Sequence, residues 1–222
     1  MDPRTQSEDN TASNLVDTSL LGAVVPDAPA QLPSYEVVLK GNYASIAPIS
    51  PSHAEDLYEL LQGPENESLF DYLFDDPYQS VEDLRTMLAR KAATTNPWTY
   101  AILLNSPSSR PKAVGMASLM RMDLPNRVIE VGSILYTRPL QRTPAATEAM
   151  YLLARYVFET LGFRRKHMIA KGRNRDTAWY SMLDEEWPMV KNALEQWLNS
   201  ENFDSDGIQK KPLGEFMTDW QK

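Results

Sequence analysis

The sequence predicts an α+β domain in which helices flank a mixed, mainly antiparallel sheet. Three observations lead to this class. Strand-like and helix-like segments follow one another in the order strand, helix, helix, three strands, helix, two strands, helix. The three central strands are joined by connections short enough for an antiparallel meander. At 222 residues, of which 42% are hydrophobic, the chain is long enough for one sizeable core.

Capping signals delimit the first two helices, which follow two short strands within 35–49. Ser50 or Ser52 caps the first helix and Gly63 ends it. A short aromatic segment then leads to a second helix at Ser80, with an acidic residue three positions later as in a capping box.

The second half of the chain supplies the meander and a buried helix. We predict strands at 98–104, 113–123 and 127–136, because each is a β-prone run bounded by turn residues. The helix over 143–161 carries apolar residues all round and should be well buried. Residues 164–183 are typical of a hairpin, and a last helix follows.

The composition excludes several classes of function. A formal net charge of −8 makes nucleic acid and anionic membranes poor partners. The chain has no cysteine, which excludes disulfides and thiolate chemistry, and its two histidines, His53 and His167, predict no metal site. The polar, acidic first residues do not resemble a signal peptide, and no apolar run approaches the roughly 20 residues of a membrane span. We therefore expect a soluble cytoplasmic protein.

The expected domain organisation has three parts. Residues 1–33 are rich in Ser, Thr, Asp, Pro and Ala and are predicted to be a disordered tail. Residues 34–200 form the folded domain. Residues 201–222 are a polar C-terminal extension.

The junction before the helix at 143–161 is a candidate anion site. A helix N-terminus offers free N–H groups and the positive end of the helix dipole. Pro144 removes one N–H but suits the first turn of a helix. Neither a P-loop nor a dinucleotide-binding glycine motif is present. From these residues alone, a well-capped core helix explains the junction equally well.

Two longer strings carry a resemblance to a known family. "LQRTPAATEAMYLLARYVFETLGF", following "RVIEVGSILY", resembles the coenzyme-A-binding core of the GNAT acetyltransferase superfamily, in its ribosomal-protein-N-acetyltransferase-like branch. Residues 141–146 occupy the family's Gln/Arg-x-x-Gly-x-Gly/Ala loop, with Pro144 in place of the middle glycine. "KHMIAKGRNRDTAWYSMLDEEWP" resembles the terminal hairpin and helix start of a fungal and bacterial subgroup. The likeness spans roughly residues 35–197.

This resemblance implies acetyl transfer from acetyl-CoA, as co-substrate and without a metal, to an amine of a small molecule or a protein N-terminus. The main chain of Ile134, Leu135 and Tyr136 matches the positions that bind pantetheine. The residues that match the pyrophosphate cradle are Arg142, Thr143, Ala145, Ala146 and Thr147.

The resemblance also points to a base, and aromatic residues on the strands could line an acceptor pocket. Glu130 lies mid-strand at the position where relatives often carry a catalytic glutamate, and such a base takes the proton from the attacking amine. An edge or solvent-facing strand residue is the alternative for Glu130. The candidates for the acceptor pocket are Trp98, Tyr100 and Trp179, although aromatic residues on strands are more often core.

One departure from the family pattern suggests an alternative function. The family places a strand and a helix between the "LGF" helix and the terminal hairpin, but here "YVFETLGFRR" runs straight into "KHMIAKG". We therefore expect an internally truncated domain in which the strand at about 175–182 pairs directly beside 127–136 and closes the cofactor slot. That closure predicts weak acetyl-CoA binding, and the alternative function is a catalytically impaired remnant that acts as a binding or interaction protein.

Overall fold

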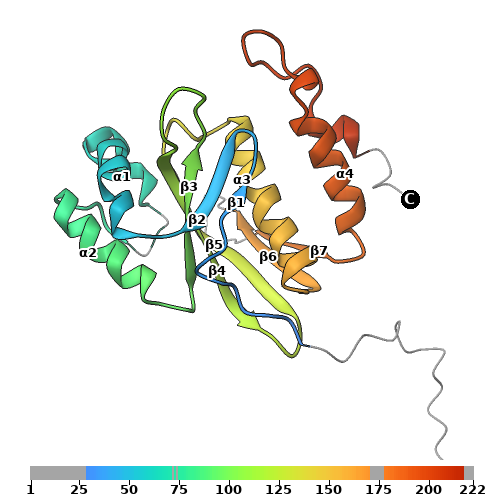
Figure 1. Cartoon of the computed structure of the whole chain (residues 1–222), viewed down its shortest axis with the longest axis horizontal. Helices are drawn as coiled ribbons and strands as arrows, with labels where there is room; N and C mark the ends of the chain where they lie inside the picture. Colours follow the sequence, from blue (N-terminus) through green and yellow to red (C-terminus); the bar gives the residue numbers. More distant parts are fainter. Residues whose placement is uncertain (1–28, 72, 74, 171–177, 218–222) are drawn as a thin grey trace, which may run out of the picture.

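The structure, a computed structural model, describes residues 29–71, 73, 75–170 and 178–217. One seven-stranded sheet runs through the molecule, and its strands lie in sequence order from β1 to β7. Helices α1 and α2 cover one face of the sheet, and α3 and α4 lie on the other (Figure 1). The predicted α+β class is confirmed.

The predicted helices and strands are all present, with boundaries close to those expected. Short 3-10 turns at Pro51–His53 and Pro64–Leu69 flank the first helix, and a π-helical turn at Tyr156–Thr160 extends the third. The elements are β1 (Leu39–Lys40), β2 (Ala44–Pro48), α1 (Ala54–Leu61), α2 (Val81–Ala92), β3 (Trp98–Leu104), β4 (Lys112–Asp123), β5 (Val128–Tyr136), α3 (Pro144–Arg155), β6 (Arg165–Ala170), β7 (Ala178–Leu183) and α4 (Trp187–Leu198).

The pairing of the terminal hairpin differs from the prediction. Strands β1 to β5 are antiparallel neighbours, as the meander required. The strand beside β5, however, is β6, in parallel, and β7 pairs with β6. The expected pairing of 175–182 with β5 is therefore wrong. Helix α3 carries the chain back to the start of β5, where the N–H of Arg164 binds the carbonyl of Arg127 at 2.9 Å. The next strand then runs in the same direction as β5, as in a βαβ unit.

Helix caps confirm most of the start signals. Ser50 caps the first helical turn, where its hydroxyl accepts the N–H of Ser52 at 3.3 Å. The hydroxyl of Ser80 accepts the N–H of Asp83 at 3.1 Å at the start of α2. The carboxylate of Asp83 binds the N–H of Gln79 rather than that of Ser80, so the predicted capping box is only half formed.

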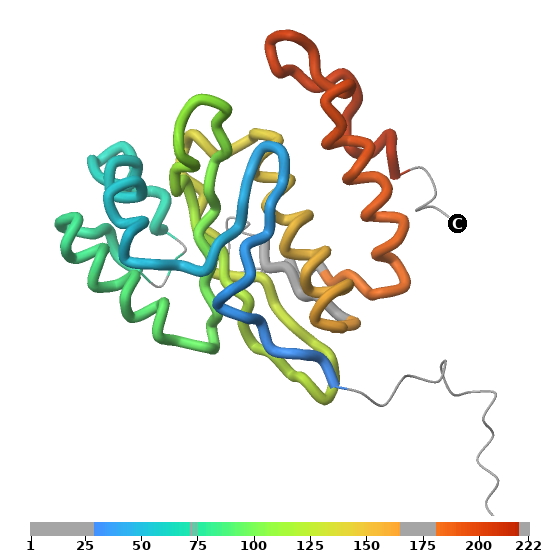
Figure 2. Tube along the Cα trace, in the orientation of Figure 1, coloured from blue at the N-terminus to red at the C-terminus, as the bar shows by residue number. Residues whose placement is uncertain are grey.

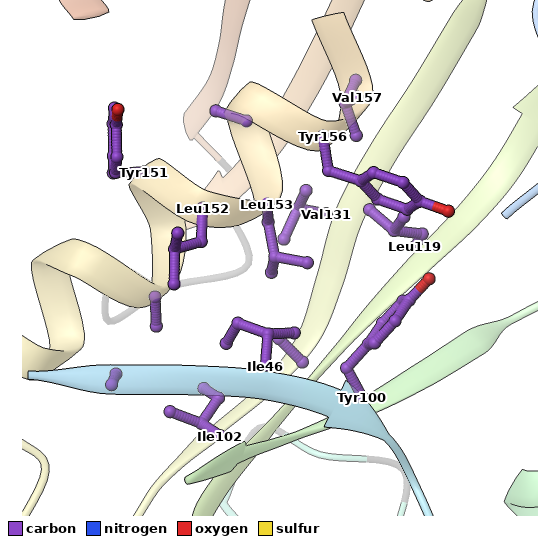
Figure 3. Close-up of a cluster of buried hydrophobic side chains, with 14 of the residues drawn as sticks. Ile46, Tyr100, Ile102, Leu119, Val131, Tyr151, Leu152, Leu153, Tyr156 and Val157 are labelled. Atoms are coloured by element: carbon purple, nitrogen blue, oxygen red, sulfur yellow. The ribbon is translucent and has the colours of Figure 1, made fainter. Parts of the chain in front are cut away.

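Two apolar cores lie on opposite faces of the sheet. The larger core packs α3 against the strands, with Tyr100, Leu152 and Val157 among its fully buried side chains (Figure 3). The smaller core packs α1 and α2 against the other face, around Leu57 and Leu88. Helix α3 carries apolar residues all round because most of its residues are buried in this core.

Both ends of the described chain pack on the domain. Residues 1–28 of the predicted tail lie outside the described residues, but Ala30 is buried and its N–H binds the carbonyl of Leu124 at 3.1 Å. This segment runs beside the β4–β5 turn (Figure 2). Within the predicted C-terminal extension, Asn202 is buried and its amide donates to the carbonyl of Trp197 at 3.0 Å.

None of the helices in the described part of the chain is long and apolar enough to cross a membrane.

Candidate active site

A wedge opens between β5 and β6. Their parallel pairing covers only Val128–Val131 against Arg165–Met168. Beyond this point β5 continues to Tyr136, whereas the last residues of β6 pair only with β7 among the described strands. Among the described strands, β5 therefore has no partner on the side of β6 from Gly132 onward.

A β-bulge turns the open part of β5. Gly132 pairs with Ser118 and Leu135 pairs with Met116, so two residues of β5 oppose one residue of β4. Ser133 lies at the bulge with a φ of 48°. Because of the extra residue, Ile134 and Tyr136 pack toward the α3 core and Leu135 faces the α1–α2 core.

The loop after β5 presents free N–H groups at the start of α3. Thr143 caps the helix, because its hydroxyl donates to the carbonyl of Leu140 at 2.7 Å and accepts the N–H of Ala146 at 3.3 Å. Arg142 adopts a left-handed φ of 60°, a conformation that glycine adopts more easily.

Three of the five N–H groups predicted for a phosphate cradle are unengaged. The N–H groups of Arg142, Thr143 and Ala145 have no hydrogen-bond partner within the described part of the chain. The other two, from Ala146 and Thr147, bind the carbonyl of Thr143 at 3.1 and 3.5 Å. Arg142 is exposed and Thr143 is half-buried, whereas Ala145 is only 2% exposed. The loop therefore offers the N–H groups of Arg142 and Thr143 to an anion at the positive end of α3.

A large cavity begins at this loop. Its volume is about 1240 Å³, and it lies between α3, β7, α4 and the segment at 203–217. Five of the eight predicted cofactor-binding residues line it. These five are Tyr136, Arg142, Thr143, Ala146 and Thr147. Leu135 and Ala145 are buried instead, and Ile134 packs against the α3 core.

The vertex of the wedge is the point at which the pairing of β5 with β6 ends, at Val131. Glu130 lies one residue before it. Its side chain is on the α1–α2 face, because Ile129 and Val131 point into the opposite core. Glu130 is only 2% exposed, and its Oε2 lies 3.0 Å from Nη1 of Arg121. Its Oε1 is buried and has no hydrogen-bond partner in the described part of the chain. A carboxylate with free lone pairs therefore stands beside the vertex.

Comparison with known proteins shows which family this chain belongs to. The model of the acetyltransferase (GNAT) domain family matches residues 45–178. The crystal structure of a GCN5-related N-acetyltransferase from Brucella melitensis is 34% identical, with a TM-score of 0.77 over 86% of this chain and 98% of that one. A protein from Chromobacterium violaceum, described as a probable GNAT-family acetyltransferase, is 24% identical, with a TM-score of 0.61 over 85% of this chain and 100% of that one. No match was found among curated proteins.

The chain belongs to the GNAT acetyltransferase family.

Within this GNAT domain, two of the three predicted acceptor residues lie away from Glu130. Trp98 is 5% exposed and Tyr100 is fully buried, and both face the α3 core on the other side of the sheet from Glu130 (Figure 3 shows Tyr100). Trp98 stacks on Tyr35 with ring centroids 4.1 Å apart. The side chain of Trp179 lies outside the described residues. A role for Trp98 and Tyr100 in acceptor binding stays a prediction that this packing does not favour.

Sequence reasoning missed two residues that lie next to Glu130, Arg121 and Gly132. Arg121, which pairs with Glu130, lies in the polar end of a predicted strand, and nothing in "LMRMD" distinguishes it from a solvated residue. Gly132 carries no signal in the sequence beyond a small residue in a strand. The described residues contain no group of three or more acidic or histidine side chains placed to hold a metal ion.

Proposed function

We propose that this GNAT domain transfers an acetyl group from acetyl-CoA to an amine, on a small molecule or at a protein N-terminus. The observation that carries the proposal is the course of β5, whose pairing with β6 ends at Val131. The strand runs from Glu130 to the loop before α3, where the N–H groups of Arg142 and Thr143 have no hydrogen-bond partner within the described residues.

The loop and the cavity fit the nucleotide end of coenzyme A. The N–H groups of Arg142 and Thr143, which have no partner within the described residues, suit the oxygens of a pyrophosphate, and the guanidinium of Arg142 adds a positive charge at the cavity wall. The protein as a whole carries a net charge of −8, so this local charge matters for attracting an anion.

The open edge of β5 fits the pantetheine arm. Unpaired main-chain N–H and C=O groups bind an extended amide chain in the way that a neighbouring strand does. From Gly132 to Tyr136 the edge is about 13 Å long at the usual rise of a strand. An arm lying there brings its thioester to the vertex.

Glu130 supplies the acid–base chemistry. When the amine forms a C–N bond with the acyl carbon, the C–S bond breaks and the sulfur leaves as a thiolate. The nitrogen loses a proton, which Oε1 of Glu130 accepts because that oxygen has free lone pairs. The thiolate then takes up a proton from solvent.

We further infer that the chain belongs to the ribosomal-protein-N-acetyltransferase-like branch and lacks an internal strand and helix. Support comes from the short connection between the π-helical turn, which ends at Thr160, and β6, which starts at Arg165. In this arrangement β6 takes over the second wall of the wedge. The expected closure of the slot rested on a pairing that the structure does not have, so we propose acetyl-CoA binding in the micromolar range.

A binding protein without catalysis is the second candidate function. The observation that favours it is the burial of Glu130, which is 2% exposed and paired with Arg121. An acceptor amine must displace part of this covering before its proton can reach the carboxylate. Binding of acetyl-CoA without acetylation of any amine would support this candidate.

Calorimetric titration and an acetylation assay test the proposal together. We expect micromolar binding of acetyl-CoA and CoA release in the presence of an amine or peptide panel. Arg142→Glu should weaken binding at least tenfold, because it places a negative charge beside the phosphates. The matched control is Arg90→Glu, at an exposed site on α2 outside the cavity, which should bind as the wild type does. Absence of binding at millimolar acetyl-CoA would overturn the proposal.

A further inference from the structure

The two carboxylate oxygens of Glu130 have different surroundings. Oε2 is held by Nη1 of Arg121 at 3.0 Å, whereas Oε1 is buried without a partner in the described part of the chain. Leaving a buried carboxylate oxygen unpaired is costly, on the order of 1–3 kcal/mol. Such a group calls for an explanation, and a role in catalysis is one that also accounts for its being an ionisable group.

The backbone of β4 is irregular where Arg121 pairs with Glu130. Met120 is the direct partner of Glu130 across the strands, so in a regular strand the side chain of the next residue would point to the opposite face. The register shifts between Met120 and Asp123, and Arg121 adopts a φ of 51°. Its N–H is held by Oδ1 of Asn96 at 3.1 Å. The bulge thus brings the guanidinium back to the face of Glu130, as bulges beside active sites do.

Because Gly132 has no side chain, there is room beside it for Oε1 of Glu130. A Cβ at this position would stand 3.0 Å from Oε1 of Glu130 and 2.6 Å from Sδ of Met120. Oε1 therefore lies over Gly132, which is the first residue of β5 beyond the last pair with β6. The free oxygen is directed along the strand toward the open part of the wedge.

We propose that Arg121 and Gly132 are positioning residues for Glu130. Arg121 fixes Oε2, and the missing side chain at Gly132 lets Oε1 face the vertex of the wedge. One oxygen of the base is thereby anchored while the other remains free for the proton of the amine. This role rests on the proposed function, because it assigns Glu130 as the base.

Steady-state kinetics of three variants test the positioning role. Arg121→Met removes the anchoring charge and keeps an apolar chain of similar reach. We expect kcat to fall about tenfold or more, within the contribution of a positioned base, while the KM and Kd for acetyl-CoA stay within twofold of wild type. Arg121→Lys should recover part of kcat, because an ammonium still pairs with Oε2. Gly132→Ala should also lower kcat, because its Cβ would stand 2.6 Å from Sδ of Met120 and 3.0 Å from Oε1 of Glu130, so that both side chains must shift.

The matched control breaks another ion pair of the same kind. Arg110 holds the buried carboxylate of Asp56 through two contacts of 2.6 and 2.7 Å, and the pair lies outside the wedge. Arg110→Met should lower the melting temperature but leave kcat unchanged. This control separates loss of stability from loss of positioning.

The outcomes distinguish a failure of the positioning role from a failure of the proposed function. An active wild type with Arg121→Met and Gly132→Ala both within twofold of its kcat would overturn the positioning role alone. A fall in kcat of similar size in Arg110→Met would overturn it too, because the effect would then reflect stability. A wild type that binds acetyl-CoA but acetylates no amine would overturn the proposed function and the positioning role with it.

Discussion

The carboxylate of Glu148 on α3 accepts the backbone N–H of Tyr43 at 2.6 Å and so ties the helix to the β1–β2 turn. The same carboxylate accepts the N–H groups of Asn42 at 2.8 Å and Ala44 at 2.7 Å. Glu148 is 4% exposed and lies on the second turn of the helix whose N-terminus borders the wedge. It thus fixes the helix relative to the sheet.

Replacing Glu148 with Gln should destabilise the domain. A Gln side chain has one acceptor oxygen, and its NH₂ group would face backbone donors, so at least one buried N–H loses its partner. We expect a loss of about 2–3 kcal/mol in the free energy of unfolding. Chemical denaturation would measure it, and an unchanged midpoint would show that the three contacts contribute little.

Gly41 should be energetically coupled to Glu148. A Cβ at Gly41 would stand 2.4 Å from Cδ of Glu148, so Gly41→Ala forces the carboxylate to move. We expect Gly41→Ala to destabilise the wild type more than it destabilises a Glu148→Ala background. Additive free energies of unfolding in the double-mutant cycle would contradict the predicted clash.

Asp56 should make stability depend on pH in the acid range. The hydrogen bonds from Arg110 hold the pKa of the Asp56 carboxyl below its usual value, and the N–H of Ala113 acts in the same direction. A lowered folded-state pKa means that the stabilisation is complete above the unfolded value, about 3.9, and is lost as the pH falls through the folded value.

Melting temperatures measured against pH, for wild type and Asp56→Asn, would show this contribution. The difference between the two proteins should be constant above about pH 5 and should shrink below about pH 4. A difference that persists at the lowest pH would mean that the ion pair is not its source.

The cap at Thr143 should support both α3 and anion binding. Thr143→Val keeps the shape of the side chain but loses both hydroxyl contacts, and we expect about 1 kcal/mol of lost stability. Thr143→Ser keeps the hydroxyl and should lose much less. If the free N–H groups depend on this cap, acetyl-CoA should bind more weakly to the Val variant than to the Ser variant in calorimetry. Equal affinities of the two variants for acetyl-CoA would show that binding does not depend on the cap.

The N-terminal residues should matter only from about residue 29. A variant lacking residues 1–28 should keep a melting temperature within a few degrees of wild type, as the polar composition of that stretch predicts. A variant lacking 1–36 also loses the buried Ala30 and the stacking of Tyr35 on Trp98, so it should melt at a lower temperature. Equal melting temperatures for the two variants would show that this packing is not stabilising.

Much of the fold could be predicted because it depends on local signals. The predicted strand at 98–104 has the same bounds as β3, since a β-prone run lies between clear turn residues. The start of α3 at Pro144 follows from Thr143 as cap and proline in the first turn. Glu130 was identifiable as a carboxylate in an apolar strand, and it proved to be buried on that strand.

The sequence by itself determined the elements, their order and the position of the loop before α3, because caps, turns and apolar periodicity act over a few residues. Only the tertiary structure decided that β6 lies parallel to β5 and that the two strands separate beyond Val131. It also decided that Arg121 reaches Glu130. The physical reason is that strand alternation is the same in parallel and antiparallel pairs, so direction depends on where a crossover returns the chain. Likewise, a bulge changes which face a side chain occupies without leaving a distinct mark in the residues around it.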